Sequence, residues 1–102
     1  MATFIVVESR TGPRYDPTKS LDDQSGFRAH ADFVDGLVEA GFIVLGGPLD
    51  DGRRTVLVVE AESAEAIRAT FRHDPWIPSH IVIESIDHWT IRLDSRRDRP
   101  GS

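Results

Sequence analysis

Cysteine is absent from the 102 residues of this chain. Without a thiol, the sequence excludes a disulfide scaffold, an iron–sulfur cluster, a thiolate zinc site and a cysteine nucleophile. Lysine is nearly absent too: Lys19 is the single lysine among 12 basic residues. It lies in a polar segment, where nothing would desolvate its amine and activate it for Schiff-base chemistry. A chain of this length forms one domain with a single two-layer core.

The sequence also lacks long apolar runs and an excess of positive charge. An apolar stretch such as Phe42–Leu45 is far too short to span a membrane. The formal net charge is −5, which argues against a nucleic-acid partner despite the short basic segment at 96–99. The start, MATFIVVESR, lacks the basic region and the cleavage site of a signal peptide. We therefore expect a cytoplasmic protein with a single domain over residues 1–93 and a disordered tail over 94–102.

Periodicity and turn residues predict six elements in the order β-α-β-β-α-β. We expect strands over 4–7, 42–45, 55–59 and from 81 as far as 93, with helices from residue 27 and after residue 63. Gly41 is the expected C-cap of the first helix, and Ser63 the N-cap of the second. Asp51-Gly52 predicts a hairpin turn, and Pro75 must end or kink the second helix.

This order favours an α+β fold of the ferredoxin-like type, an antiparallel sheet with both helices on one face. The other face would still carry apolar residues, so a second copy of the chain is the simplest cover and a homodimer is expected. RNA-recognition domains share this topology but place aromatic side chains on the central strands, where this chain offers only Phe4. The long loop over 10–26 is either a functional lid or a tolerated surface excursion.

Two polar residues fall where the helical pattern calls for apolar ones. His30 lies near the middle of an apolar arc in the first helix, which is formed by Phe27, Phe33, Val34, Leu37 and Val38. Asp74 follows Ile67 and Phe71 at i+7 and i+3, on the core-facing side of the second helix. If the two pair, Asp74 fixes the tautomer of His30 and leaves its other nitrogen free as a general acid or base. On spacing alone, a buried histidine beside an Asp-Pro turn is the simpler interpretation.

The remaining candidates carry weaker signals. His73, Asp74 and His80 match no standard metal-ligand spacing, so no metal is expected. Gly46-Gly47-Pro48 precedes a hairpin rather than a helix, which indicates a bulge or a close backbone approach instead of a phosphate loop. Trp76 either walls a pocket or fills the core.

These residues together resemble the YCII-related (YciI-like) family of dimeric α+β barrel proteins. The segments that carry the resemblance are HADFVDGLVEAGFIVLGGPLDDG, VVEAES and HDPW, and the match runs from about residue 4 to residue 89. The resemblance implies a ferredoxin-like fold, a dimer with facing sheets, and a site built on a histidine–aspartate pair, which falls on His30 and Asp74. It also implies that the segment from Gly46 to Leu49 lines the same pocket.

The resemblance favours a site at His30 and Asp74, and three functional hypotheses follow. The first is a lyase- or isomerase-type enzyme, without a cofactor, in which His30 moves a proton on a small cyclic or aromatic substrate. Asp74 would orient His30, while Gly46, Gly47, Pro48 and Trp76 would bind the substrate. The second is a non-catalytic dimeric module that binds a small ligand or acts as an accessory partner. A haem- or metal-dependent oxygenase, which shares the barrel architecture, is the third.

Overall fold

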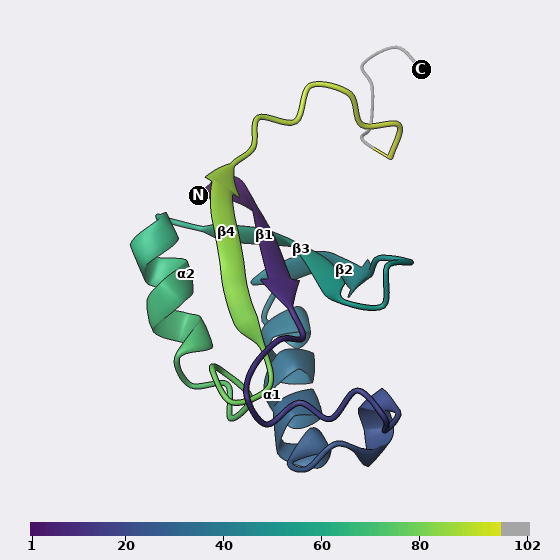
Figure 1. Ribbon diagram of the computed structural model, residues 1–102. Coiled ribbons are helices and arrows are strands. Elements are labelled where there is room, and N and C mark those ends of the chain that lie inside the picture. The colour runs from purple at the N-terminus through teal and green to yellow at the C-terminus, as the bar shows by residue number, and fades with distance from the viewer. Residues whose placement is uncertain (97–102) are drawn as a thin grey trace.

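The computed structural model describes residues 1–96. Its elements are β1 (Ala2–Ser9), the short 3-10 helix η1 (Leu21–Asp23), α1 (Phe27–Glu39), β2 (Ile43–Pro48), β3 (Arg54–Ala61), α2 (Ala64–Phe71) and β4 (Val82–His88). Figure 1 shows these elements along the chain. The predicted β-α-β-β-α-β order is therefore present, with η1 as an addition inside the long loop. Most of the predicted disordered tail, from residue 97 on, lies outside the described residues.

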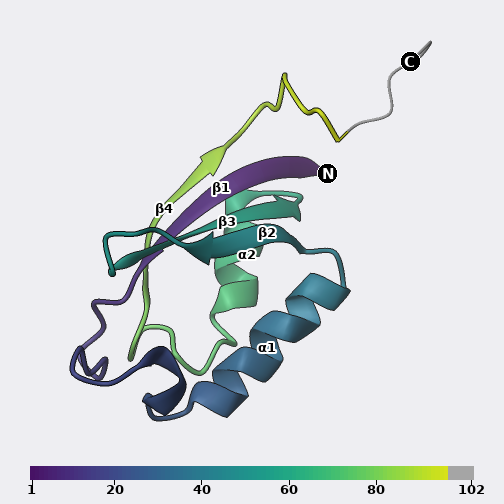
Figure 2. The same ribbon diagram turned by 90° about the vertical axis from the view of Figure 1, so that its right-hand side faces the viewer.

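All strand pairs in the sheet are antiparallel, in the order β2-β3-β1-β4. Both helices lie on one side of the sheet, as Figure 2 shows. The fold is thus α+β, with a four-stranded antiparallel sheet and two helices, and is compatible with the ferredoxin-like type. None of the described helices is long and apolar enough to cross a membrane.

The core lies between the sheet and the helices, and period-2 alternation decides which strand residues enter it. On β1 the buried residues include Phe4 and Val6, and on β3 they include Leu57 and Val59. α2 contributes Ile67 and Phe71, both at most 1% exposed. These side chains form one continuous apolar cluster.

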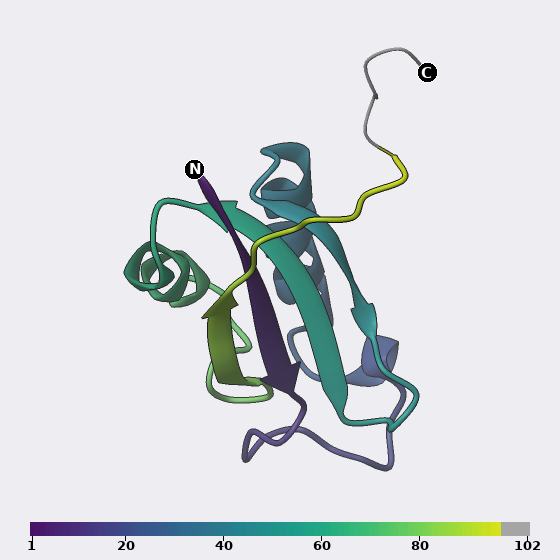
Figure 3. The same ribbon diagram turned by 90° about the horizontal axis from the view of Figure 1, so that it is seen from above.

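The opposite face of the sheet carries no helix, and in Figure 3 the strands lie in front of α1 when seen from this side. Ile5, Val7, Val56 and Val58 alternate with the core residues, so they lie on this open face, and each is partly exposed. Leu45 of β2 pairs with Val58 and is half exposed. The open face therefore carries an apolar surface in the single chain.

Local capping signals fix the ends of several elements. Ser63 accepts a hydrogen bond from the backbone N–H of Ala66 at 3.1 Å, which is the expected N-cap of α2. Gly41 follows α1 with a φ of 78°, a left-handed conformation that glycine adopts without steric strain. The hairpin between β2 and β3 turns at Gly52, whose φ is 71°.

Three predictions need correction. β4 ends at His88 instead of Leu93, close to where its antiparallel neighbour β1 begins at Ala2: Phe4 pairs with His88, and the Trp89 N–H donates to the Thr3 carbonyl at 2.8 Å.

The other two corrections concern the helices. α2 ends at Phe71, so Asp74 lies in the turn that follows rather than on the helix. In α1 the apolar stripe is narrower than predicted: Val38, at the edge of the arc, is 51% exposed.

Candidate functional site

A cavity of about 180 Å³ lies between the sheet, α1 and the turn after α2. Its wall is mostly apolar, with side chains from each of these layers and from η1: Leu21, Val34, Leu57, Phe71 and Ile81. Four ionisable side chains, Glu8, Arg10, His30 and Asp74, also line it. An apolar cavity with a few convergent polar groups is the usual form of a small-molecule site.

His30 and Asp74 come together inside this cavity. The Nδ1 atom of His30 lies 2.9 Å from each carboxylate oxygen of Asp74, and the Asp74 side chain is 1% exposed. Because a carboxylate only accepts hydrogen bonds, Nδ1 carries the proton and donates it. Asp74 also accepts the backbone N–H of Trp76 at 2.9 Å, so its carboxylate closes the turn as well as holding the imidazole.

The second ring nitrogen of His30, Nε2, makes no hydrogen bond with any residue in the described part of the chain. With the proton on Nδ1, a neutral His30 has a bare Nε2 that can accept a proton, and a charged His30 can give one back. His30 is thus arranged as an acid–base group whose tautomer is set by Asp74.

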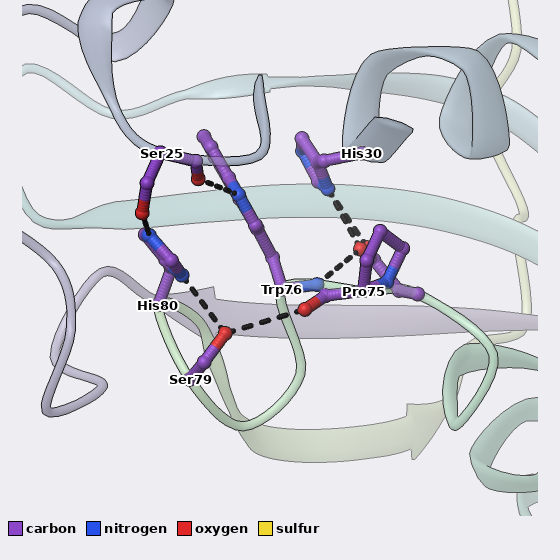
Figure 4. A network of polar contacts seen from close by, with 7 residues as sticks. Ser25, His30, Pro75, Trp76, Ser79 and His80 are labelled. Carbon is purple, nitrogen blue, oxygen red and sulfur yellow. Dashed lines mark hydrogen bonds and ion pairs between the residues drawn. The ribbon is translucent and has the colours of Figure 1, made fainter. Parts of the chain in front are cut away.

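Trp76 builds the wall behind His30 and is 1% exposed. Its rings stack on His30 with a centroid distance of 4.1 Å and an interplanar angle of 8°. On the other side they stack on His80 at 4.8 Å and 11°. The indole Nε1–H donates to the Ser25 carbonyl at 2.8 Å, which fixes the ring between the two imidazoles (Figure 4). Of the two interpretations of Trp76, a pocket wall and a core residue, both apply.

His80, which the sequence offered only as a metal candidate, is buried behind Trp76. Its Nε2 lies 3.0 Å from Ser25 Oγ and its Nδ1 lies 2.8 Å from Ser79 Oγ. Burial, followed by the charges of Arg14 and His30, lowers the pKa of His80 below its usual value. Each nitrogen of the neutral His80 imidazole is therefore engaged by a serine hydroxyl group. Through these two contacts, His80 joins the loop before α1 to the turn before β4 (Figure 4).

Glu8 is a residue of the site that the sequence analysis missed. It is 6% exposed and lines the cavity. Burial first, and the nearby charge of Asp74 second, raise the pKa of Glu8 to about 7. The signal was present in the sequence, since Glu8 follows Phe4 and Val6 at period 2 and must share their face of the strand.

The predicted substrate-binding residues divide into two groups. Pro48 and Trp76 line the cavity, whereas Gly46 and Gly47 are not among its lining residues. A Cβ at Gly46 would lie 2.5 Å from Leu57 Cδ2, so this glycine leaves room for the Leu57 side chain. The pairing of β2 with β3 shifts register between Ile43 and Leu45, ahead of the glycines, whereas Gly46 and Gly47 pair in regular register with Leu57 and Val56.

The loop over 10–26 packs against the cavity and against the turn before β4. Leu21 supplies part of the cavity wall, whereas Gly12 and Arg14 donate backbone hydrogen bonds to the carbonyls of His80 and Ser79. A Cβ at Gly12 would collide with the Pro78 and Ser79 carbonyl groups, which leaves glycine as the residue that fits. The loop thus contributes Arg10 and Leu21 to the lining of the cavity.

Within residues 1–96, no group of three or more His, Cys, Asp or Glu side chains is placed to hold a metal ion. His73 is exposed and His80 is held by the two serines, so the three residues weighed as ligands are not brought together.

Comparison of the chain with protein-family models, with curated proteins and with solved structures finds no match. The resemblance to YCII-related proteins therefore stays a prediction.

Proposed function

We propose that this protein is a small acid–base enzyme in which His30 transfers a proton to or from a small cyclic or aromatic substrate. The observation that carries the proposal is the Asp74 carboxylate on Nδ1 of His30, a residue that lines the cavity and whose Nε2 has no hydrogen-bond partner among the described residues. An imidazole held in one tautomer by a buried carboxylate is a recurrent arrangement for a general base. A reaction of the elimination or isomerisation type needs one such group and no cofactor.

The size of the cavity supports the class of substrate. A volume of about 180 Å³ is close to that of an apolar cavity known to hold one benzene molecule, about 150 Å³. The Trp76 indole and the aliphatic walls suit a flat or compact apolar ring. One positioned acid–base group accelerates proton transfer by about 10²–10⁴-fold, so the substrate must carry a proton that is already acidic.

The proposal includes membership of the YCII-like group and a dimeric α+β barrel. The open face of the sheet, with Ile5, Val7, Val56 and Val58, is the surface that a second copy would cover. Exposed apolar patches of this kind are typical of interaction sites, and most soluble oligomers are symmetric. Sedimentation velocity tests the proposed dimer. We expect the parent to sediment as a dimer and the double variant Val56→Asp/Val58→Asp to sediment as a monomer.

The alternative is a non-catalytic dimer that binds a small ligand in the same cavity. The mostly apolar wall favours this alternative, because burial of an apolar ring needs no proton transfer. In that case His30 contacts the ligand or only stabilises the fold.

Deuterium exchange separates the two functions. Single-ring ketones and lactones with an acidic C–H are incubated in D₂O with the parent or with His30→Asn, and loss of the C–H signal is followed by NMR. We expect exchange on at least one compound to be 10²- to 10⁴-fold faster with the parent than with the variant. His73→Asn, which changes an exposed histidine beside the site, is the matched control and should exchange like the parent.

Equal rates for the parent and His30→Asn on every compound would contradict the enzyme proposal. Saturable binding of a compound together with equal rates would favour the binding module.

A further inference from the structure

Glu8 is a buried carboxyl group whose position is explained neither by a contact within the fold nor by a bond to His30 or Asp74. It lies on the core face of β1, with Thr55 opposite on β3 and Ile83 opposite on β4. Its side chain makes no hydrogen bond with any described residue. A buried polar group without a partner destabilises a fold by about 1–3 kcal/mol, and an apolar residue at this position would avoid that loss.

The carboxyl oxygens of Glu8 face the cavity. Among the described residues, no side-chain oxygen or nitrogen that is closed off from solvent lacks a hydrogen-bond partner. Because Glu8 has no such partner and lines the cavity, its oxygens must be reachable from the cavity. A ligand there would meet this carboxyl group directly.

None of the charged and titratable groups around the cavity stabilises the ionised form of Glu8. Asp74, from the turn after α2, faces it as a negative charge and disfavours a second carboxylate. Arg10 also lines the cavity, but one of its guanidinium nitrogens donates to Thr55 Oγ1 at 3.1 Å and none forms an ion pair with Glu8. His30 is held by Asp74, so it does not neutralise Glu8 either. A carboxyl group in such a place retains its proton toward neutral pH.

We propose that Glu8 is a second proton-transfer residue of the cavity, one that donates to an oxygen atom of the ligand while Nε2 of His30 takes a proton from a neighbouring carbon. This inference rests on the proposed function and narrows its substrate class to single-ring carbonyl compounds with an acidic C–H next to the carbonyl, and to their enols. A carboxylic acid kept neutral by an apolar site is a known device for stabilising an enol or enolate oxygen.

The step balances without a co-reactant. The C–H electron pair becomes the new C=C bond as the proton moves to Nε2 of His30, and the carbonyl π pair moves to oxygen. That oxygen takes the proton, or a strong hydrogen bond, from Glu8. The reverse transfers return both protons, at the same carbon for exchange or at another carbon of the enol for isomerisation. Asp74 stabilises the imidazolium that forms in between.

Carbon-13 NMR of the protein labelled at its glutamate carboxyl carbons tests the inference, with phenol as the probe because it is a stable single-ring enol. The Glu8 signal is assigned by its loss in Glu8→Gln. We expect it to titrate near pH 7 in the parent and at lower pH in Asp74→Asn, because the charge of Asp74 raises the pKa of Glu8. We also expect saturating phenol to shift this signal.

Variants give a second readout. Glu8→Leu should weaken phenol binding about three- to tenfold, the effect of one hydrogen bond, while the fold tolerates an apolar residue at this position. Glu60→Leu, which replaces an exposed glutamate on β3, is the matched control and should bind phenol like the parent.

A Glu8 signal that titrates near the ordinary value of about 4.3 would overturn the inference. So would equal phenol affinity in the parent and Glu8→Leu, or no saturable binding of phenol. Failure of the proposed function would give a different result. The compounds would then exchange deuterium equally fast with the parent and with His30→Asn, while the titration of Glu8 would be as expected.

Discussion

Two histidines lie on opposite faces of the Trp76 indole and have different partners. His30, which lines the cavity, donates from Nδ1 to a carboxylate, and its Nε2 has no hydrogen-bond partner among the described residues. His80 meets two serine hydroxyls, one at each nitrogen, on the side of the loop. Both rings stack nearly parallel to the indole.

The partners decide what each imidazole can do. A carboxylate fixes the tautomer and stabilises the charged ring, but it uses only one nitrogen, so the other remains available for chemistry. Two hydroxyl groups satisfy a neutral ring completely and leave nothing for a ligand. Burial and the nearby positive charges also lower the pKa of His80, which keeps it neutral. The difference in partners is why the proposed acid–base role falls to His30, whereas both nitrogens of His80 are engaged by serine hydroxyl groups.

Removal of the shared indole should have the largest effect on this arrangement. Trp76→Ala deletes a fully buried side chain and both stacking contacts, so we expect the free energy of unfolding to fall by about 3–5 kcal/mol. Urea unfolding measures this change. Trp89→Ala, at a position that is 40% exposed, is the control and should change stability by less than about 1 kcal/mol. Similar losses in the two variants would contradict the position of Trp76 between the histidines.

The cavity side of the indole should respond to rising pH through Glu8. The pKa of Glu8 is raised to about 7 in the folded state, so its contribution to stability is complete below the unfolded value and is lost as pH rises through 7. Between pH 5 and pH 8, the free energy of unfolding of the parent should fall by up to about 3 kcal/mol relative to that of Glu8→Gln. Urea unfolding at the two pH values tests this. A parallel pH dependence in the parent and Glu8→Gln would show that Glu8 is not buried as described.

The opposite side of the indole should respond to falling pH through His80. Its pKa is lowered in the folded state, so its contribution to stability is complete above the unfolded value near 6.5 and is lost as pH falls through the folded value. His80→Asn should therefore flatten the acid side of the stability profile. His73→Asn, at an exposed position, should leave that side as in the parent. If the free energy of unfolding of His80→Asn fell at acidic pH as steeply as that of the parent, His80 would not be a neutral, buried histidine.

The smallest effects are expected from the serines that hold His80. Ser25→Ala and Ser79→Ala each remove one hydrogen bond to the ring, at about 1 kcal/mol of stability. Ser20→Ala, which changes an exposed serine without a capping bond to η1, should be close to neutral. If Ser25→Ala were as neutral as Ser20→Ala, the hydroxyl would not be part of the support for His80.

Local signals predicted much of the fold. Gly41, Ser63 and the Asp51-Gly52 turn act through neighbouring backbone groups, so their positions are encoded within a few residues. The end of β4 could not be predicted in this way, because it depends on the register of its pairing with β1, a strand far away in the sequence.

Helical spacing singled out His30 and Asp74, and the resemblance to YCII-related proteins favoured a site there. Spacing placed His30 and Asp74 on facing sides, and the two are in contact, although Asp74 lies beyond the helix on which it was expected. Glu8 was missed although strand alternation placed it in the core. The bonds of His80 to Ser25 span 55 positions and depend on how a loop and a turn fold against Trp76, which no local pattern encodes.

The most direct test of the account is the tautomer of His30, read from the nitrogen-15 shifts of its imidazole ring at a pH where the ring is neutral. The hydrogen bond to Asp74 predicts a protonated Nδ1 and a bare Nε2 in the parent, and a shift toward the Nε2–H tautomer in Asp74→Ala. His80 in the same spectra serves as the internal reference. A His30 ring that is protonated on Nε2 in the parent, and unchanged in Asp74→Ala, would contradict the account, because the cavity would then hold no imidazole prepared to take a proton.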